Sequence, residues 1–402
     1  MNLKDLLVIE TGPGMAGPLV TRTLADFGAK VIKVESRTKL DFGKTRVPPP
    51  GKTAEDVLEA PGVMEMSGGK HSVTLNLKTE KGRELFLRLI DLTDVYVESY
   101  APGWLERIGL SIEMFAERNP RLIALSQSAF GGDGPRRDQR AYAPLMTAAA
   151  GVESTVGYED GRIVPQIASA VGDVVAAYFG NLLVMSALYD RERTGRGAMI
   201  DMSQTEASAA MAGIALAEYG LSGEVPRPRG NSDPRAVPHG VYRTAGDDDW
   251  VALAVWNDDE WQTLCTALGI ADADRDRFAH VSARIADSPE VDRIVAERVV
   301  IEKRDPLWER LQAVGISCTP ILDIYEADEF PALVDRKLWT EFQHPRTGSL
   351  RMTEIPWRFD TLDLRRRAWA EPIGTSTNEI LTDLLGATAE ELEAWQSTGV
   401  LQ

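Results

Sequence analysis

The sequence predicts an α/β protein whose N-terminal part is a doubly wound, parallel sheet. Short apolar runs alternate with helix-length stretches through the first 130 residues. The links between these first elements are short, as in strand–helix–strand units, which form parallel sheets. A chain of 402 residues with 44% apolar and 26% charged residues is long enough for two globular domains.

The first half reads as strand, helix, strand in repetition. Residues 5–10 predict a strand, 18–27 a helix that ends at Gly28, and 29–35 a second strand. Segment 36–66, which contains PPPG at 48–51, predicts a long surface loop. The pattern resumes with a strand SVTLNL, a helix opened by a Thr79 cap, a strand DVYVESY, a helix near 102–108 and a strand at 121–130.

The second half begins with a long, mostly apolar helical stretch at 168–190, followed by an Ala-rich helix at 205–221. A polar, Pro-rich link at 223–238 leads to a hairpin-like pair, HGVYRTAGDDDWVALAVW, which opens a second domain. Helices near 257–268 and 286–302, a strand at 316–322, an extended stretch at 346–360 and a helical tail complete the prediction.

Composition and motifs argue against several classes of function. A net charge of −17 repels duplex nucleic acid and anionic membranes, so an anionic ligand needs a local basic site. The two cysteines, Cys265 and Cys318, have no metal or disulfide spacing, and neither HExxH nor GxSxG occurs, so no metal site and no serine hydrolase is expected. The N-terminus does not fit a secretory signal, and no stretch approaches the ~20 apolar residues of a membrane span, so a cytoplasmic protein is expected.

The glycine-rich turn after the first strand raises the question of a dinucleotide. Gly12-Pro-Gly-Met-Ala-Gly17 matches the GxGxxG fingerprint, and Glu35 ends the next strand. Pro13 and Pro18, however, remove backbone donors from the region that would cradle a pyrophosphate. A dinucleotide oxidoreductase and a plain strand-to-helix turn both remain open on this pattern.

Asp173 is the candidate catalytic carboxylate. It follows Gly172 and is surrounded by apolar and small residues, where an unpartnered carboxylate costs free energy. A helix N-cap is an equally good interpretation, since Asp is favoured there. Both roles are compatible at a helix start that exposes a carboxylate to a ligand.

Basic residues gather in the first half, several of them after predicted strand ends, where open α/β sheets bind ligands. This pattern is compatible with a phosphorylated ligand, although a solvated face is the better interpretation of any single one of them. They are Arg37, Lys39, Lys44, Arg46, Lys70, His71, Lys78, Arg107, Arg136, Arg137 and Arg140.

Several blocks in order resemble one family over nearly the whole chain. These are AGPLVTRTLADFGAKVIKVE, SVTLNLKTEKGRELF, DVYVESYAPGWLERIGL, NPRLIALSQSAFG, RTGRGAMIDMSQTEA and PIGTSTNEIL. They resemble the class III coenzyme A transferases, the CaiB/BaiF family, which includes formyl-CoA and carnitine CoA-transferases and related α-methylacyl-CoA racemases. The resemblance implies a Rossmann-like sheet that accommodates coenzyme A (CoA) and uses no nicotinamide, with Glu35 as a structural or loop residue.

The resemblance also assigns residues. The family's nucleophilic aspartate falls on Asp173, in the matching Gly-Asp pair. The positions that it implies for CoA binding are Met15, Ala16, Arg37, Leu75, Lys78, Ser99, Tyr100, Ala101, Arg107, Arg140 and Tyr142. The reaction implied is transfer of CoA from an acyl-CoA donor to a carboxylic acid through an aspartyl anhydride and an aspartyl-CoA thioester, with CoA as substrate and no tightly bound cofactor.

This chain departs from the family pattern at several positions. A glutamine common in the first turn is Met15 here, an asparagine is Ser99, and an arginine aligns with Ser36, which leaves Arg37 as its substitute. The racemase branch has a histidine at Tyr142 and a glutamate near Asn257, so α-proton exchange would lack an acid/base partner. A racemase-like enzyme and a non-catalytic CoA-binding subunit of a heteromeric transferase are the alternatives.

The architecture implied is a large Rossmann-like α/β domain interrupted by a smaller α+β domain, in an interlocked, ring-like homodimer. The expected boundaries are a CoA-binding domain at 1–204, a link at 205–231, a small domain at 232–322, a link at 323–345, and a segment at 346–402 that returns to the large domain. The expected partners are an acyl-CoA, a carboxylic acid and a second copy of the chain, with neither nucleic acid nor membrane.

Overall fold

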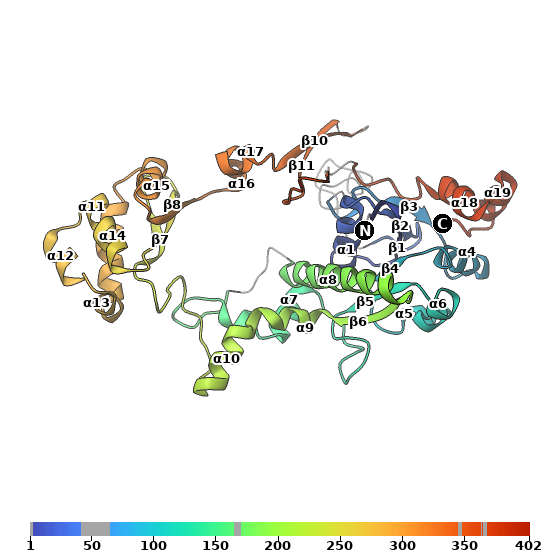
Figure 1. Cartoon of the computed structure of the whole chain (residues 1–402), viewed down its shortest axis with the longest axis horizontal. Helices are drawn as coiled ribbons and strands as arrows, with labels where there is room; N and C mark the ends of the chain where they lie inside the picture. The colour runs from blue at the N-terminus through green and yellow to red at the C-terminus, as the bar shows by residue number, and fades with distance from the viewer. Residues whose placement is uncertain (1–2, 42–64, 165–169, 345–347, 363, 365–367) are drawn as a thin grey trace. The chain divides into compact units, whose positions relative to one another are not determined.

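The computed structural model describes residues 3–41, 65–164, 170–344, 348–362, 364 and 368–402. Two compact units emerge, each built from separate pieces of the chain (Figure 1). Unit 1 consists of Met1–Glu153, Gln166–Gly223 and Asp335–Gln402, and unit 2 of Ser154–Pro165 and Glu224–Val334. Most of the predicted surface loop at 36–66, with Lys44 and Arg46, lies outside the described residues.

Unit 1 is built on a six-stranded sheet in the order β3-β2-β1-β4-β5-β6, and every neighbouring pair is parallel. The prediction of a mixed α/β fold with a parallel sheet is therefore confirmed. The strands are β1 (Leu7–Glu10), β2 (Lys30–Glu35), β3 (His71–Thr74), β4 (Val95–Glu98), β5 (Ile123–Ser128) and β6 (Ala198–Ser203). The strand order reverses between β1 and β4, and open parallel sheets bind ligands beyond the carboxyl ends of the strands at such a point.

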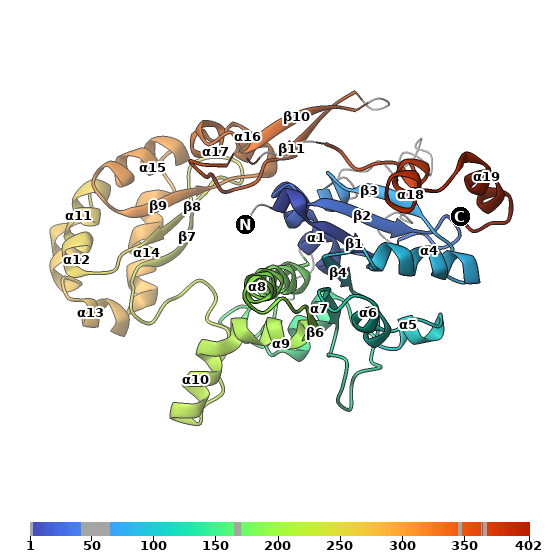
Figure 2. The ribbon, with the colours of Figure 1, turned by 45° about the vertical axis from the view of Figure 1, so that its right-hand side comes forward.

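Helices cover both faces of this sheet, as Figure 2 shows. On one face, α1 (Ala16–Asp26) and α8 (Val171–Thr194) pack on apolar residues such as Val8, Val97 and Leu125. On the other face, α4 (Glu80–Ile90), α5 (Trp104–Arg107), α6 (Ile112–Arg118), α18 (Thr377–Leu385) and α19 (Ala389–Ser397) enclose a core around Ile9, Ile32 and Tyr96. Strands buried on both faces explain the continuous apolar runs of the sequence.

The remaining elements of unit 1 are short and come from the N-terminus, the middle of the chain and the C-terminal segment. They are η1 (Leu3–Asp5), α7 (Ala143–Ala149), α9 (Gln204–Ala209), η4 (Ala210–Ala212), α10 (Gly213–Ser222) and the antiparallel pair β10 (Trp339–His344) and β11 (Gly348–Thr353). The short helix η3 (Glu153–Thr155) spans the junction with unit 2.

Unit 2 is a three-stranded antiparallel sheet with helices around it. The strands pair in the order β7-β8-β9, which confirms the predicted hairpin. Its elements are β7 (His239–Arg243), β8 (Trp250–Ala254), α11 (Asp258–Leu268), α12 (Asp272–Arg277), α13 (Val281–Ala286), α14 (Ser288–Val299), α15 (Arg304–Ala313), β9 (Ser317–Ile321), α16 (Ile324–Glu329) and α17 (Pro331–Asp335), the last ending at the boundary with unit 1. Both free cysteines, Cys265 and Cys318, are buried in its core.

Some predicted elements differ from the structure. The single helix expected at 205–221 is α9, a 3₁₀ turn and α10, with Gly213, a weak helix former, at the junction. The helix expected at 286–302 is shorter and is preceded by α13. The expected link at 323–345 contains α16, α17 and β10, and β10 forms an antiparallel pair with the next strand, β11.

Helix α8 corrects one expectation about membranes. By length and composition it is apolar enough to cross a bilayer, although 33% of the relevant window is buried inside the structure. One such helix is weak evidence for a span, because core helices of soluble proteins meet the same criteria. The buried residues Ala176, Val184 and Leu188 pack α8 against the sheet of unit 1.

Candidate active site

Asp173 lies on the carboxyl side of the parallel sheet. It is in the first turn of α8, whose N-cap is Ala170, so the interpretation of Asp173 as the N-cap is wrong. Helix α8 runs back along the strands, since Arg191 near its end donates to carbonyls of Asp94 and Arg121 at the amino ends of β4 and β5. Gly180 is level with the second half of β5, and Asp173 lies two turns earlier, about 10 Å beyond it.

The Asp173 carboxylate has no hydrogen-bond or ion-pair partner within the described residues. Burial alone raises the pKa of Asp173 to about 6. At neutral pH this group is therefore ionised but poorly solvated, and its oxygens are not occupied by another side chain. Such a carboxylate is available to attack an electrophile.

Gly172 explains why the aspartate follows a glycine. A Cβ atom at this position would lie 3.2 Å from the carbonyl oxygen of Ala143 and 3.3 Å from Cγ2 of Thr147, both in α7. Ser208 Oγ of α9 would be 3.4 Å away. The first turn of α8 therefore packs closely between two other helices, which fixes the backbone that carries Asp173.

Two of the turns implied to bind CoA lie side by side at the β1/β4 reversal. Ser99 Oγ donates to the carbonyl oxygen of Pro13 at 3.2 Å, and a Cβ atom on Gly12 would come within 2.9 Å of the Ser99 nitrogen. Gly12 is thus required by the close approach of the two turns. The turn that carries Met15 and Ala16 therefore lies next to Ser99, and a Cβ atom on Gly17 would also be 3.0 Å from Ser99 Oγ, although the Ala16 side chain itself is buried.

The Tyr100 turn is held from two sides. Its ring stacks on Trp104 with centroids 3.9 Å apart, and its backbone N–H donates to Oε2 of Glu98 at 2.7 Å. Burial raises the pKa of Glu98 to about 7, against the lowering effect of hydrogen bonds from Ser126 and Tyr100. A buried carboxyl group at the end of β4 therefore fixes this turn.

A basic hollow of about 340 Å³ lies beside the β3–α4 connection. We use this name for the site lined by Lys78, Arg83, Arg107, Ile108 and Gly109. Arg83 Nη1 donates to the carbonyl oxygens of Lys78 at 3.0 Å and Leu77 at 3.3 Å, so it also fixes the loop that carries Lys78. The hollow joins Lys78 and Arg107, both expected from the sequence, to Arg83, which the sequence analysis missed because it looks like an ordinary solvated helix charge.

The other implied CoA contacts are more dispersed. Arg37 donates to the carbonyl oxygen of Ile373 at 2.6 Å, which ties the end of β2 to the C-terminal segment. The Leu75 side chain is only 2% exposed and belongs to the core of unit 1, so it presents no side-chain surface. Arg140 is exposed and Tyr142, at the N-cap of α7, is 64% exposed.

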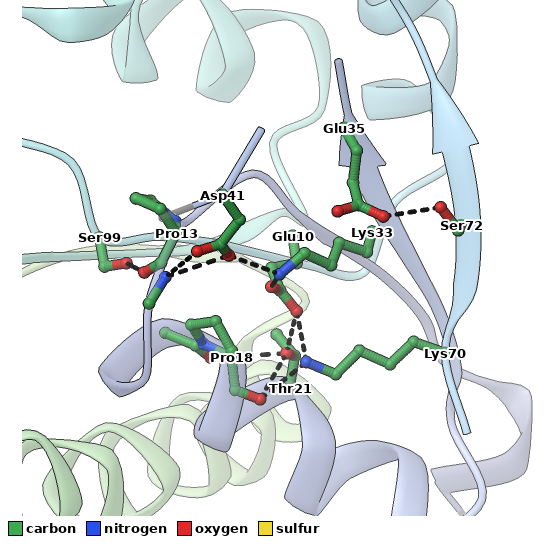
Figure 3. A network of polar contacts seen from close by, with 12 residues as sticks. Glu10, Pro13, Pro18, Thr21, Lys33, Glu35, Asp41, Lys70, Ser72 and Ser99 are labelled. Carbon is green, nitrogen blue, oxygen red and sulfur yellow. Dashed lines mark hydrogen bonds and ion pairs between the residues drawn. The ribbon is translucent and has the colours of Figure 1, made fainter. Parts of the chain in front are cut away.

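Lys70, which the sequence placed among possible ligand-binding cations, is instead buried in an ion-pair network (Figure 3). Its Nζ donates to Oε2 of Glu10 at 2.6 Å and to the carbonyl oxygen of Pro18 at 2.7 Å. Lys33 donates to Oε1 of Glu10 at 2.9 Å. Burial raises the pKa of Glu10, but the two lysine charges outweigh it and bring the pKa to about 2.

The same network reaches the glycine-rich turn. Asp41 Oδ2 lies 3.3 Å from Nζ of Lys33, and both Asp41 carboxylate oxygens accept from the Gly14 N–H, at 3.0 and 3.1 Å. In a dinucleotide fingerprint the second glycine is where the backbone approaches the pyrophosphate. A protein carboxylate already takes that donor here, which argues against the dinucleotide interpretation.

Unit 1 thus has the fold of an α/β protein with a half-buried carboxylate on the carboxyl side of its sheet and a basic hollow beside the β3–α4 connection. The chain belongs to CoA-transferase family III, whose model matches residues 3–377. It is 31% identical to succinyl-CoA–D-citramalate CoA-transferase of Chloroflexus aurantiacus, over 99% of this chain and 98% of that protein. Formyl-CoA:oxalate CoA-transferase of Streptomyces avermitilis is 30% identical over 99% of both chains.

A solved structure agrees with this assignment. The crystal structure of a CaiB/BaiF family protein from Brucella suis has a TM-score of 0.85 and 30% sequence identity, and the alignment covers 95% of this chain and 99% of that one. The resemblance to class III CoA transferases is therefore confirmed, and the protein is a CoA-transferase enzyme.

Proposed function

We propose that the enzyme moves CoA between an acyl-CoA donor and a carboxylic acid, with Asp173 as the nucleophile. The observation that carries this proposal is the half-buried Asp173 carboxylate on the carboxyl side of the sheet, which has no partner within the part of the chain that the structure describes. The strand order β3-β2-β1-β4-β5-β6, typical of Rossmann-type sheets, supports a nucleotide-containing substrate on the same side.

The proposed chemistry has two symmetric halves. An Asp173 oxygen attacks the thioester carbonyl carbon and the C–S bond breaks. The acyl group is then bound to Asp173 as a mixed anhydride, and CoA is released as a thiolate. The thiolate then attacks the aspartyl carbonyl, which releases the donor acid and forms an aspartyl-CoA thioester. The acceptor carboxylate attacks this thioester to form a second anhydride, and the returning thiolate takes the new acyl group and regenerates Asp173.

In this proposal the nucleotide of CoA binds the basic hollow. Lys78, Arg83 and Arg107 offer several charged donors to phosphate groups in a chain with a net charge of −17. The neighbouring turns at Met15 and Ala16 and at Ser99, Tyr100 and Ala101 are proposed to line the path of the pantetheine. Backbone groups of Leu75 and the side chains of Arg37, Arg140 and Tyr142 remain proposed contacts.

The names of the relatives suggest the substrate class. Similar proteins are named for succinyl-CoA with D-citramalate, mesaconate or L-malate, one for succinate with glutarate, and others for oxalate. All of these acids carry two carboxylates. We propose a short acyl-CoA as donor and a short dicarboxylic acid as acceptor.

Two alternatives have specific weaknesses. A racemase needs a second acid/base group, but Tyr142 is an exposed N-cap and Asn257 caps α11 by accepting from the Glu260 N–H. A subunit that needs a partner chain is suggested by one relative, which is named the alpha subunit of a succinyl-CoA–L-malate CoA-transferase. Turnover by the purified single chain would remove that alternative.

We propose a homodimer of the interlocked type, with an interface that includes α8. Four large side chains form one exposed stripe along this helix, at the spacing of successive turns: Tyr178, Leu182, Met185 and Tyr189. Helix α10 has no buried residue, and Leu221 near its end is 92% exposed. Contiguous apolar patches of this kind mark association surfaces, and a cytoplasmic dimer would cover them.

The covalent step can be tested directly. The protein is incubated with a panel of acyl-CoAs and dicarboxylic acids, products are identified by mass spectrometry, and hydroxylamine is added during turnover. We expect a hydroxamate on Asp173 in the wild type and neither hydroxamate nor transfer in Asp173→Ala. Full activity in Asp173→Ala would reject the assignment of the nucleophile.

A further inference from the structure

The glycine-rich turn has the sequence of a phosphate-binding turn but holds an internal anion. Gly14, with a left-handed φ of 79°, is the second glycine of Gly12-Pro-Gly-Met-Ala-Gly17. Its N–H donates to both oxygens of Asp41, at 3.0 and 3.1 Å. The turn opens α1, an 11-residue helix, whose N-terminus favours a negative charge.

Buried charged side chains gather around this carboxylate. Glu10 and Asp41 face Lys33 and Lys70, and the nitrogen–oxygen distances of these ion pairs are 2.6 to 3.3 Å (Figure 3). The Lys33, Lys70 and Glu10 side chains are at most 5% exposed, and that of Asp41 is 11% exposed. Removal of the Asp41 charge would take one carboxylate away from the buried Lys33 ammonium group and would free the Gly14 N–H as a backbone donor.

We propose that Asp41 is a specificity-determining residue: its carboxylate occupies the anion position of the glycine turn and keeps phosphate groups out of it. A phosphate brought to this turn would compete with Asp41 for the Gly14 N–H and would meet its negative charge at close range. The phosphates of a nucleotide ligand are thereby directed to the basic hollow at Lys78, Arg83 and Arg107.

The inference rests on the proposed function and adds to it that the nucleotide of CoA does not bind at the glycine-rich turn. The exclusion of phosphate from the turn does not depend on Asp173 or on turnover. Its test therefore uses inorganic pyrophosphate and no acyl-CoA, and it can fail while CoA transfer through Asp173 stands, or succeed while that mechanism fails.

The first experiment creates the missing site. Inorganic pyrophosphate is titrated by calorimetry into the wild type, Asp41→Ala and Asp41→Ser, the last keeping a hydroxyl partner for Lys33. Asp91→Ala is the matched control, because it removes one acid from a surface ion pair with Arg118. We expect one additional pyrophosphate site per chain in both Asp41 variants and no additional site in Asp91→Ala. Binding in the Asp41 variants identical to that of the wild type would overturn the proposal.

The second experiment uses the wild type and does not depend on a variant that folds. Hydrogen–deuterium exchange is followed by mass spectrometry with and without pyrophosphate. We expect slower exchange in peptides around the basic hollow and unchanged exchange in peptides that cover 10–20. Slower exchange at 10–20 in the wild type would show that the turn accepts phosphate beside Asp41, which contradicts the inference.

Discussion

At the scale of single residues, the Asp173 carboxylate is available for reaction, and its burial lowers the stability of the folded protein. Its carboxylate has no partner among the described residues, and burial raises its pKa from 3.8 to about 6. A group whose pKa is higher in the folded than in the unfolded state destabilises the fold once the pH rises above the unfolded value. Such a cost is typical of a functional carboxylate, which must stay free to react.

Replacement of Asp173 by Asn is expected to raise stability and abolish transfer. The gain in the free energy of unfolding should be near zero at pH 4, grow between pH 4 and 6, and reach roughly 1–3 kcal/mol above pH 6, because the ionised form is then no longer buried. Denaturant unfolding at several pH values measures this gain. A loss of stability at pH 8 would mean that the carboxylate has a partner in solution.

The pH dependence of activity should report the same group. A nucleophilic carboxylate acts when ionised, so kcat/KM is expected to rise with pH through about 6 and then to level off. The buffer series should include a structural control by circular dichroism at each pH. A kcat/KM that stays constant from pH 5 to 7 would show that ionisation of Asp173 does not control the rate-determining step.

At the scale of elements, loops at the carboxyl ends of the strands create the site. The turn after β1 contacts the turn after β4 through Ser99 and Pro13, and the loop after β3 joins the end of α5 in the basic hollow. Each loop is fixed by a buried or paired group, such as Glu98 under Tyr100 and Arg83 beside Lys78. Loops that are fixed in this way at the ends of rigid strands hold the charged groups in place, so that little conformational entropy is lost when a ligand binds.

The basic hollow predicts a separation between nucleotide and thioester recognition. Arg107→Ala is expected to weaken CoA binding about tenfold, since one charged donor to phosphate is lost. Affinity for a pantetheine thioester, which lacks the nucleotide, should not change. Lys81→Ala, on neighbouring α4 and paired with Glu84, is the control for a lost positive charge. The affinities for CoA are measured by calorimetry. An Arg107→Ala variant that binds CoA as tightly as Lys81→Ala would contradict the assignment.

At the scale of the whole molecule, the chain leaves a long apolar stripe on α8 and an apolar α10. In the proposed homodimer a second copy would cover both. Leu182→Asp, in the middle of the α8 stripe, is expected to shift the protein towards monomer in light scattering. Leu92→Asp, an equally large exposed residue after α4, should leave the mass unchanged. A monomeric wild type would remove the dimer from the proposal.

Several site features were predictable because they follow from local patterns. Asp173 stood out as a carboxylate in an apolar helix, and the two prolines of the glycine turn argued against a dinucleotide. Lys70 and Asp41 could not be interpreted correctly, because their partners Glu10 and Gly14 are 60 and 27 residues away along the chain. Arg83 was missed because a solvated helix charge and a residue that lines a hollow look alike in sequence. A buried ion pair with Glu10 and a solvated lysine look alike in sequence.

The sequence by itself determined the alternation of strands and helices, the family and the candidate nucleophile, because apolar periodicity and ordered motif blocks are properties of neighbouring residues. Only the tertiary structure decided that the Gly14 N–H is taken by Asp41 and that Lys78, Arg83 and Arg107 share one hollow. Hydrogen bonding and charge pairing act over a few ångströms in space, and chain folding alone sets which distant residues come within that range.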